Sequence, residues 1–148
     1  MRQQRLANAV AMLAIALIAA CANNGGMRDA DKLALYRAHA GAPVASFRYF
    51  GSINGWTPLG DNAIAVWTRP SQAYLLDLGG ACPDIATAHA ISLTEQMGTV
   101  SARFDKVIAR GPGTTMQIPC AIREIRPLDT KAIRQAERQA RADQASGT

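Results

Sequence analysis

The chain of 148 residues is 49% hydrophobic, 18% charged and only 5% aromatic. These proportions exclude a disordered polar tail, a collagen-like repeat and a multidomain protein. The formal net charge of +5 falls to about +3 when the arginines at positions 2 and 5 are set aside with the leader described next, and so modest a charge does not indicate nucleic-acid binding. We expect one small globular domain.

The N-terminal segment differs sharply in composition from the rest of the chain. Arg2 and Arg5 precede an uninterrupted run of apolar and small residues from Ala9 to Ala20. Basic residues followed by an apolar run are typical of a secretory signal peptide, and the run is shorter than the roughly 20 residues of a membrane-spanning helix. We therefore expect residues 1–20 to be a signal peptide that the mature protein lacks.

The end of this segment resembles the lipobox of bacterial lipoproteins. It reads Leu17-Ile18-Ala19-Ala20-Cys21, an aliphatic residue and small residues before the cysteine that receives the lipid. The resemblance implies lipidation of Cys21, a lipidated tether over residues 21–28 and, because Ala22 rather than aspartate follows, the periplasmic face of the outer membrane. Ordinary cleavage at Ala20-Cys21-Ala22 is the alternative.

Two further cysteines, Cys82 and Cys120, remain in the mature chain. Disulfides form and persist in an exported protein, so we expect these two to pair. Such a bond closes a loop of about 39 residues and stabilises the fold by roughly 4 kcal/mol. The spacing fits neither a C-x-x-C redox motif nor a zinc site. A Cys82 nucleophile with His89 as its base is the weaker alternative, because no third group orients the histidine.

A short helix opens the predicted domain, which spans residues 29–128. Acidic Asp29 lies in its first turn and basic Arg37 in its last, which suits the helix dipole. Gly41 and Pro43 follow and end the helix.

Strand-forming runs occupy the middle of the chain, with turns between them. They are residues 47–50, 63–68, 73–78, 90–94, 100–104, 106–109 and 116–126. The first three predict a three-stranded meander, with a hairpin turn at residues 69–72. Pro119 within the last run indicates an edge strand or a bulge, and Pro127 is expected to end the sheet.

Residues 129–148 predict a C-terminal helix and tail, capped by Asp129 or Thr130. Its narrow apolar stripe indicates partial docking. Its basic residues are Lys131, Arg134, Arg138 and Arg141. They could bind anionic lipid or cell-wall polymer, but the acids and glutamines between them favour a solvated helix. The predicted fold is α+β and mainly β: a small antiparallel sheet curled into a sandwich or partial barrel, with a short N-terminal and a C-terminal helix.

Several short motifs across residues 45–128 carry a family resemblance. They are Ile53-Asn54-Gly55-Trp56, Ala73-Tyr74-Leu75-Leu76-Asp77-Leu78, Cys82-Pro83-Asp84-Ile85, Phe104-Asp105-Lys106-Val107 and Cys120-Ala121-Ile122. The chain resembles a domain-of-unknown-function family of small exported lipoproteins from Gram-negative bacteria. The resemblance implies export, a Cys82–Cys120 disulfide and a β-rich domain, and it brings no catalytic residues.

Aromatic residues near the predicted sheet suggest a ligand surface. We name Tyr49, Trp56 and Trp67, with Asp105 beside them, as its candidate residues. Packing in the core is the commoner role of aromatic side chains in a small β domain and is the alternative.

The sequence indicates no cofactor and no metal site. His39 and His89 are too few and too far apart in the chain to supply the ligands of a metal ion. We expect a membrane-anchored periplasmic lipoprotein that binds or scaffolds a protein or polymer partner in the cell envelope. The alternative is a small envelope hydrolase that uses Asp77 or Asp105, and it requires two convergent acids or an acid with His89.

Overall fold

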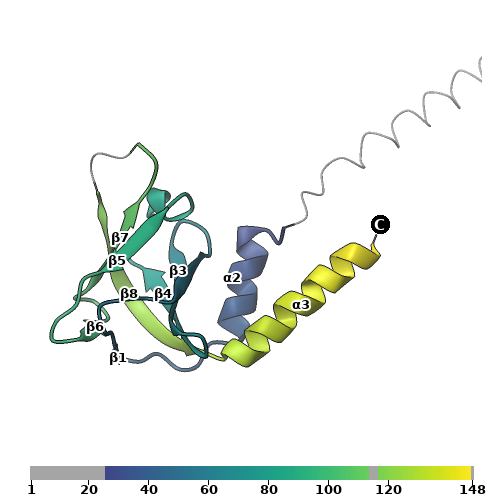
Figure 1. The fold of residues 1–148 in the computed structure, drawn as a ribbon, viewed down its shortest axis with the longest axis horizontal. Helices are drawn as coiled ribbons and strands as arrows, with labels where there is room; N and C mark the ends of the chain where they lie inside the picture. The colour runs from purple at the N-terminus through teal and green to yellow at the C-terminus, as the bar shows by residue number, and fades with distance from the viewer. Residues whose placement is uncertain (1–25, 114–116, 148) are drawn as a thin grey trace, which may run out of the picture.

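The computed structural model describes residues 26–113 and 117–147. They form a strongly curled six-stranded antiparallel sheet, a half-barrel, with two helices beside it (Figure 1). The fold is mainly β, which confirms the predicted fold class. The predicted signal peptide and Cys21 lie outside the described residues.

The six-stranded sheet has the strand order β2-β3-β4-β8-β7-β5. Its strands are β2 (Gly55–Pro58), β3 (Ala63–Arg69), β4 (Gln72–Leu78), β5 (Ala90–Leu93), β7 (Lys106–Arg110) and β8 (Pro119–Leu128). A separate two-stranded ribbon pairs β1 (Ser46–Arg48) with β6 (Thr99–Ser101). The predicted hairpin is confirmed, since Arg69 pairs with Gln72 across a two-residue loop.

The predicted meander was wrong in its first strand. Residues 46–48 are not part of the six-stranded sheet, because they pair with β6. The strand that pairs with β3 at this edge is β2, which we did not predict. The ribbon covers the hollow of the half-barrel: Phe47 stacks on Tyr74 with ring centroids 4.4 Å apart. The ribbon therefore closes a core that a curled sheet alone would leave open to water.

The sheet is buried on both faces at β3 and β4. Ile64 and Leu76 face the interior of the half-barrel, whereas Ala65 and Leu75 face the helices. Burial on two faces explains why β3 begins as a continuous apolar run instead of alternating.

Strand β8 lies in the middle of the sheet, between β4 and β7. The expectation that Pro119 marks an edge strand was wrong: it is the first residue of β8, a position that tolerates a missing N–H. Pro127 does not end the sheet either, because it pairs with Tyr74. A bulge is present further along, where Asp77 pairs with Glu124 but Leu78 pairs with Ile122.

Cys82 and Cys120 form a disulfide, with Cα atoms 6.0 Å apart. Cys82 directly precedes the 3-10 turn η2 (Pro83–Ile85), and Cys120 lies near the start of β8. The bond ties the loop after β4 to the centre of the sheet. It also removes the Cys82 thiol, so the nucleophile alternative with His89 was wrong.

Two helices, α2 (Asp29–Ala38) and α3 (Thr130–Ser146), pack side by side on the outer face of the sheet (Figure 1). Ile133 of α3 is fully buried, and the Asp129 carboxylate caps this helix by accepting the Ala132 N–H at 3.0 Å. Tyr36 of α2 is buried and donates its hydroxyl to Glu137 at 2.9 Å. Among the described residues, no helix has the length and apolar content needed to cross a membrane.

Loss of the disulfide should destabilise the domain. A Cys82→Ser/Cys120→Ser variant should lose about 4 kcal/mol of unfolding free energy, because its unfolded chain regains the freedom of the closed loop. Urea unfolding with and without reductant measures this. Reductant should destabilise the parent protein and leave the double variant unchanged; equal stability of the two proteins without reductant would contradict the expectation.

The buried Tyr36 hydroxyl should make stability fall at alkaline pH. Burial, together with the neighbouring Glu137 carboxylate, raises the pKa of Tyr36 from 10.0 to about 12. The contribution is therefore fully present below pH 10.0 and is lost as the pH rises towards about 12, amounting to about 2–3 kcal/mol. Unfolding measured across this range should be less pH-dependent in Tyr36→Phe, and identical profiles would refute the assignment.

Candidate functional site

The aromatic residues predicted to form a ligand surface do not share one. Tyr49 is only 8% exposed, and its burial with the nearby Glu95 charge raises the pKa of its hydroxyl. Trp56 pairs with Val66 and packs against the core inside the half-barrel. Trp67, the next residue after Val66, faces the other side of the sheet, where the Arg134 guanidinium lies 5.2 Å from its ring centroid.

Asp105, the fourth predicted residue, is buried and fixes a turn. One carboxylate oxygen accepts the Thr94 hydroxyl at 2.8 Å, and the other accepts the backbone N–H of Ser101 at 2.7 Å. Its own N–H also bonds the Ser101 carbonyl. Both carboxylate oxygens are thus occupied inside the protein, and Asp105 holds the turn between β6 and β7 in one shape.

This turn presents Arg103 and Phe104 to solvent. Arg103 has a φ of +70°, a left-handed backbone conformation that is uncommon outside glycine and accounts for the early end of β6 at Ser101. Its N–H bonds the Ile122 carbonyl at 2.7 Å, and the Ala102 N–H bonds the Ala45 carbonyl at 2.9 Å. Phe104 is consequently held 78% exposed on a clamped backbone.

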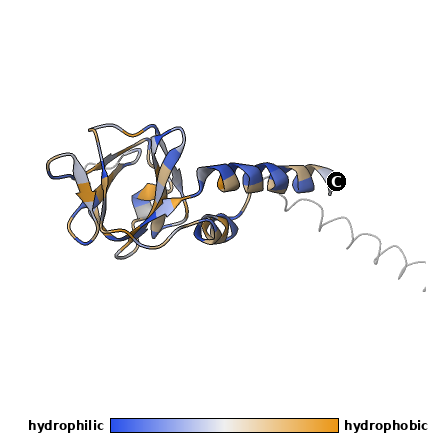
Figure 2. Cartoon of the chain, turned by 90° about the horizontal axis from the view of Figure 1, so that it is seen from below, coloured by the Kyte–Doolittle hydropathy of each residue, from blue (hydrophilic) through white to orange (hydrophobic). Residues whose placement is uncertain are grey.

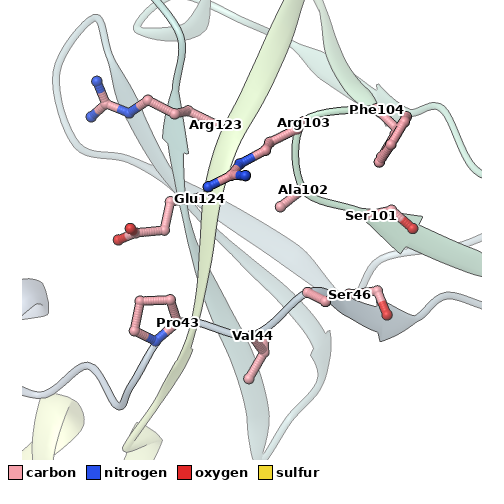
Figure 3. Close-up of a pocket in the computed structure, with 10 residues that line it drawn as sticks. Pro43, Val44, Ser46, Ser101, Ala102, Arg103, Phe104, Arg123 and Glu124 are labelled. Carbon is pink, nitrogen blue, oxygen red and sulfur yellow. The ribbon is translucent and has the colours of Figure 1, made fainter.

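A groove of about 530 Å³ runs beside this turn, and we call it the arginine groove (Figure 3). Residues 43–46 and 101–104 line it together with Arg123 and Glu124 of β8. Figure 3 shows the Arg103 side chain lying over β8, with Arg123 extending away from it. A neighbouring cavity of about 300 Å³ shares Arg123 and Glu124 and adds Arg37, Asp77 and Arg126.

The charges along these two cavities are only partly balanced. Arg126 bonds Glu124 at 2.6 Å, and Arg37 of α2 bonds the buried Asp77 at 2.6 Å. The ion pairs found in the described part of the chain include neither Arg103 nor Arg123. The arginine groove therefore offers two cationic groups to a ligand, beside the apolar surface of Phe104 and Val44.

Two carboxylates, Asp77 and Glu124, line the cavity next to the arginine groove. Asp77 and Glu124 lie opposite each other on neighbouring strands, but each is bound by an arginine. Asp105 is bound within its turn, and His89 is exposed in the loop before β5. Within residues 26–113 and 117–147, no three histidine, cysteine or acidic side chains gather to hold a metal ion. The groove is suited to anion binding.

The sequence alone did not indicate Arg103, Phe104 and Arg123 as residues of one surface. The spacing of Ile122 and Ile125 indicates a bulge only once both are known to be buried, because core residues three positions apart in a strand require an intervening residue that turns outwards. Nothing in the sequence placed residues 101–104 beside residues 43–46, which depends on the β1–β6 pairing.

Replacing the Asp105 carboxylate should loosen the turn that carries Phe104. Asp105→Asn should cost about 1–3 kcal/mol of unfolding free energy, because an amide has one acceptor oxygen and cannot accept both the Thr94 hydroxyl and the Ser101 N–H. Amide exchange at residues 101–105 should quicken. Asp84→Asn is the matched control, since Asp84 is half-buried and its carboxylate has no hydrogen bond among the described contacts. Equal effects of the two substitutions would contradict this role.

Comparison with known proteins identifies a family for the chain. A family of unknown function, DUF6491, matches residues 4–144, which includes the whole sheet and nearly all of α3. No curated protein and no solved structure matches the chain. Because the match covers almost the full length, the protein belongs to the DUF6491 family.

Proposed function

We propose that the protein is a lipid-anchored periplasmic lipoprotein of the Gram-negative cell envelope, tethered through Cys21 to the outer membrane, that binds an envelope partner. The lipobox-like run from Leu17 to Cys21 supports the anchor. The Cys82–Cys120 disulfide supports an oxidising compartment.

The arginine groove carries the binding part of this proposal. Exposed apolar and cationic groups lie together there on a backbone that Asp105 and the Ala45 carbonyl hold in place. Because the backbone of residues 101–105 is fixed before a ligand arrives, binding loses little backbone entropy there. Phe104, at 78% exposure, gives the groove an apolar group at one side, and the two arginines without ion pairs give it charge.

The partner is an acidic peptide segment of an envelope protein. Its carboxylates would pair with Arg103 and Arg123, and separate apolar side chains of the segment would cover Phe104 and Val44. The charge of the groove favours such a segment over a basic one, since Glu124 is already engaged by Arg126. Guanidinium groups suit carboxylates because they can donate two parallel hydrogen bonds.

Photocrosslinking in cells tests the groove. Phe104→p-benzoylphenylalanine should give a protein adduct, which Arg103→Glu/Arg123→Glu should reduce roughly tenfold, equivalent to about 1.4 kcal/mol. Phe50 is the matched control position, since it is a 70% exposed phenylalanine outside the groove and also has an arginine, Arg69, 5.8 Å from its ring.

Each result decides the proposal. A discrete adduct at position 104 with an acidic segment of a protein, absent at position 50, supports it. Adducts of equal yield at both positions, or an adduct at 104 that survives charge reversal, would overturn it. Crosslinks to polysaccharide alone would assign the groove to a polymer ligand and reject the peptide.

A further inference from the structure

Helix α3 carries a stripe of basic residues along one side. Lys131, Arg134, Arg138 and Arg141 follow one another at spacings of three, four and three residues. At 3.6 residues per turn they fall within an arc of about 80°. All are exposed, and we call this set the basic stripe.

The basic stripe borders the side of α3 that docks on the domain, and two of its members also approach the domain: Arg134 contacts the sheet, and Arg141 lines the cavity between the helices. Ile133 is buried against the sheet, and Glu137 accepts the Tyr36 hydroxyl on the side that faces α2. Arg134, nearest the sheet, lies over Trp67 and also donates to the Pro70 carbonyl. The ion pairs of the described residues involve none of the basic stripe. Figure 2 shows the helix extending beyond the half-barrel with hydrophilic residues along its length.

The chain enters the domain beside the same helix. Gly26 and Met27 line a cavity of about 250 Å³ between the helices, together with Arg141 and Gln144 of α3. Cys21 precedes Gly26 by about five residues, which an extended chain spans in at most roughly 18 Å. A lipid on Cys21 therefore keeps the C-terminal half of α3 close to the bilayer surface.

We propose that the basic stripe binds anionic phospholipid headgroups of the membrane in which the Cys21 lipid is inserted. This inference rests on the proposed lipid anchor. Each arginine near an anionic leaflet raises the surface-bound population roughly fivefold. An acyl anchor alone leaves the domain free to rotate on its tether, whereas a second, electrostatic contact along α3 fixes its orientation.

Hydrogen exchange on the full, lipidated protein tests this proposal. The protein is reconstituted into vesicles of phosphatidylcholine alone or of equal parts phosphatidylcholine and phosphatidylglycerol. Exchange of α3 amides should slow only in the anionic vesicles. Arg138→Gln/Arg141→Gln should lower the docked-to-free ratio roughly thirtyfold and abolish the slowing. Arg48→Gln/Arg110→Gln, which removes the same charge from exposed positions elsewhere, should leave it intact.

Salt and the state of Cys21 separate the possible failures. Slowing that disappears in 1 M salt, where the Debye length is about 3 Å, supports the headgroup contact. Suppose that the intact mass shows acylation at Cys21 and that the α3 amides exchange equally fast in both kinds of vesicle. This result would refute binding by the basic stripe but not the lipid anchor. An unacylated protein would remove the anchor, and cosedimentation with the same vesicles would then test the stripe alone. Binding of α3 to purified peptidoglycan but to neither vesicle would overturn the lipid assignment.

Discussion

The bulge at Arg123 is the constraint on which the arrangement of the sheet depends. Strand β8 contributes both Ile122 and Ile125 to the core inside the half-barrel. In a regular strand, side chains three positions apart point to opposite faces, so one of these isoleucines would leave the core. Exposing one would cost about 1.5–3 kcal/mol. Because Arg123 is the extra residue, the pairing shifts by one position and both isoleucines remain inside.

The position of β8 extends this constraint to its neighbours. One edge of the strand pairs with β4. The other edge of β8 pairs with β7 near its start. Further along this edge, backbone carbonyls of β8 accept the N–H groups of Arg103, Val44 and Gly41 in turn. A Cβ atom at Gly41 would lie 3.1 Å from the Pro127 ring, so the close approach of this segment favours glycine. Slipping β8 by one residue would therefore disrupt the core and both edges together.

The same geometry creates the charged surface beside the core. With Ile122 and Ile125 turned inwards, Arg123 faces solvent, while Glu124 and Arg126 lie on the outer side of the sheet near Asp77. Arg37 reaches from α2 to the buried Asp77, so this side of the sheet is joined to the helix by an ion pair as well as by apolar contacts. Asp77 and Glu124 form ion pairs with Arg37 and Arg126. The ion pairs of the described residues do not include Arg103 or Arg123.

Local signals in the sequence predicted the fold class, the β3–β4 hairpin, a cap at Asp129 or Thr130, and the cysteine pair; the cap is Asp129. Each of these predictions rests on residues close together in the chain or on the number of cysteines in the exported chain. The sequence did not predict β2, since Gly55 and Pro58 disfavour a strand unless a partner such as β3 is present. It also failed to place the site, because Trp56 and Trp67 point to opposite faces and the groove depends on the non-local pairing of β1 with β6. Only tertiary contacts bring the groove residues together: hydrogen bonds fix the backbone of residues 101–105, and the bulge in β8 exposes Arg123, so that both arginines stay outside the ion pairs of the described residues.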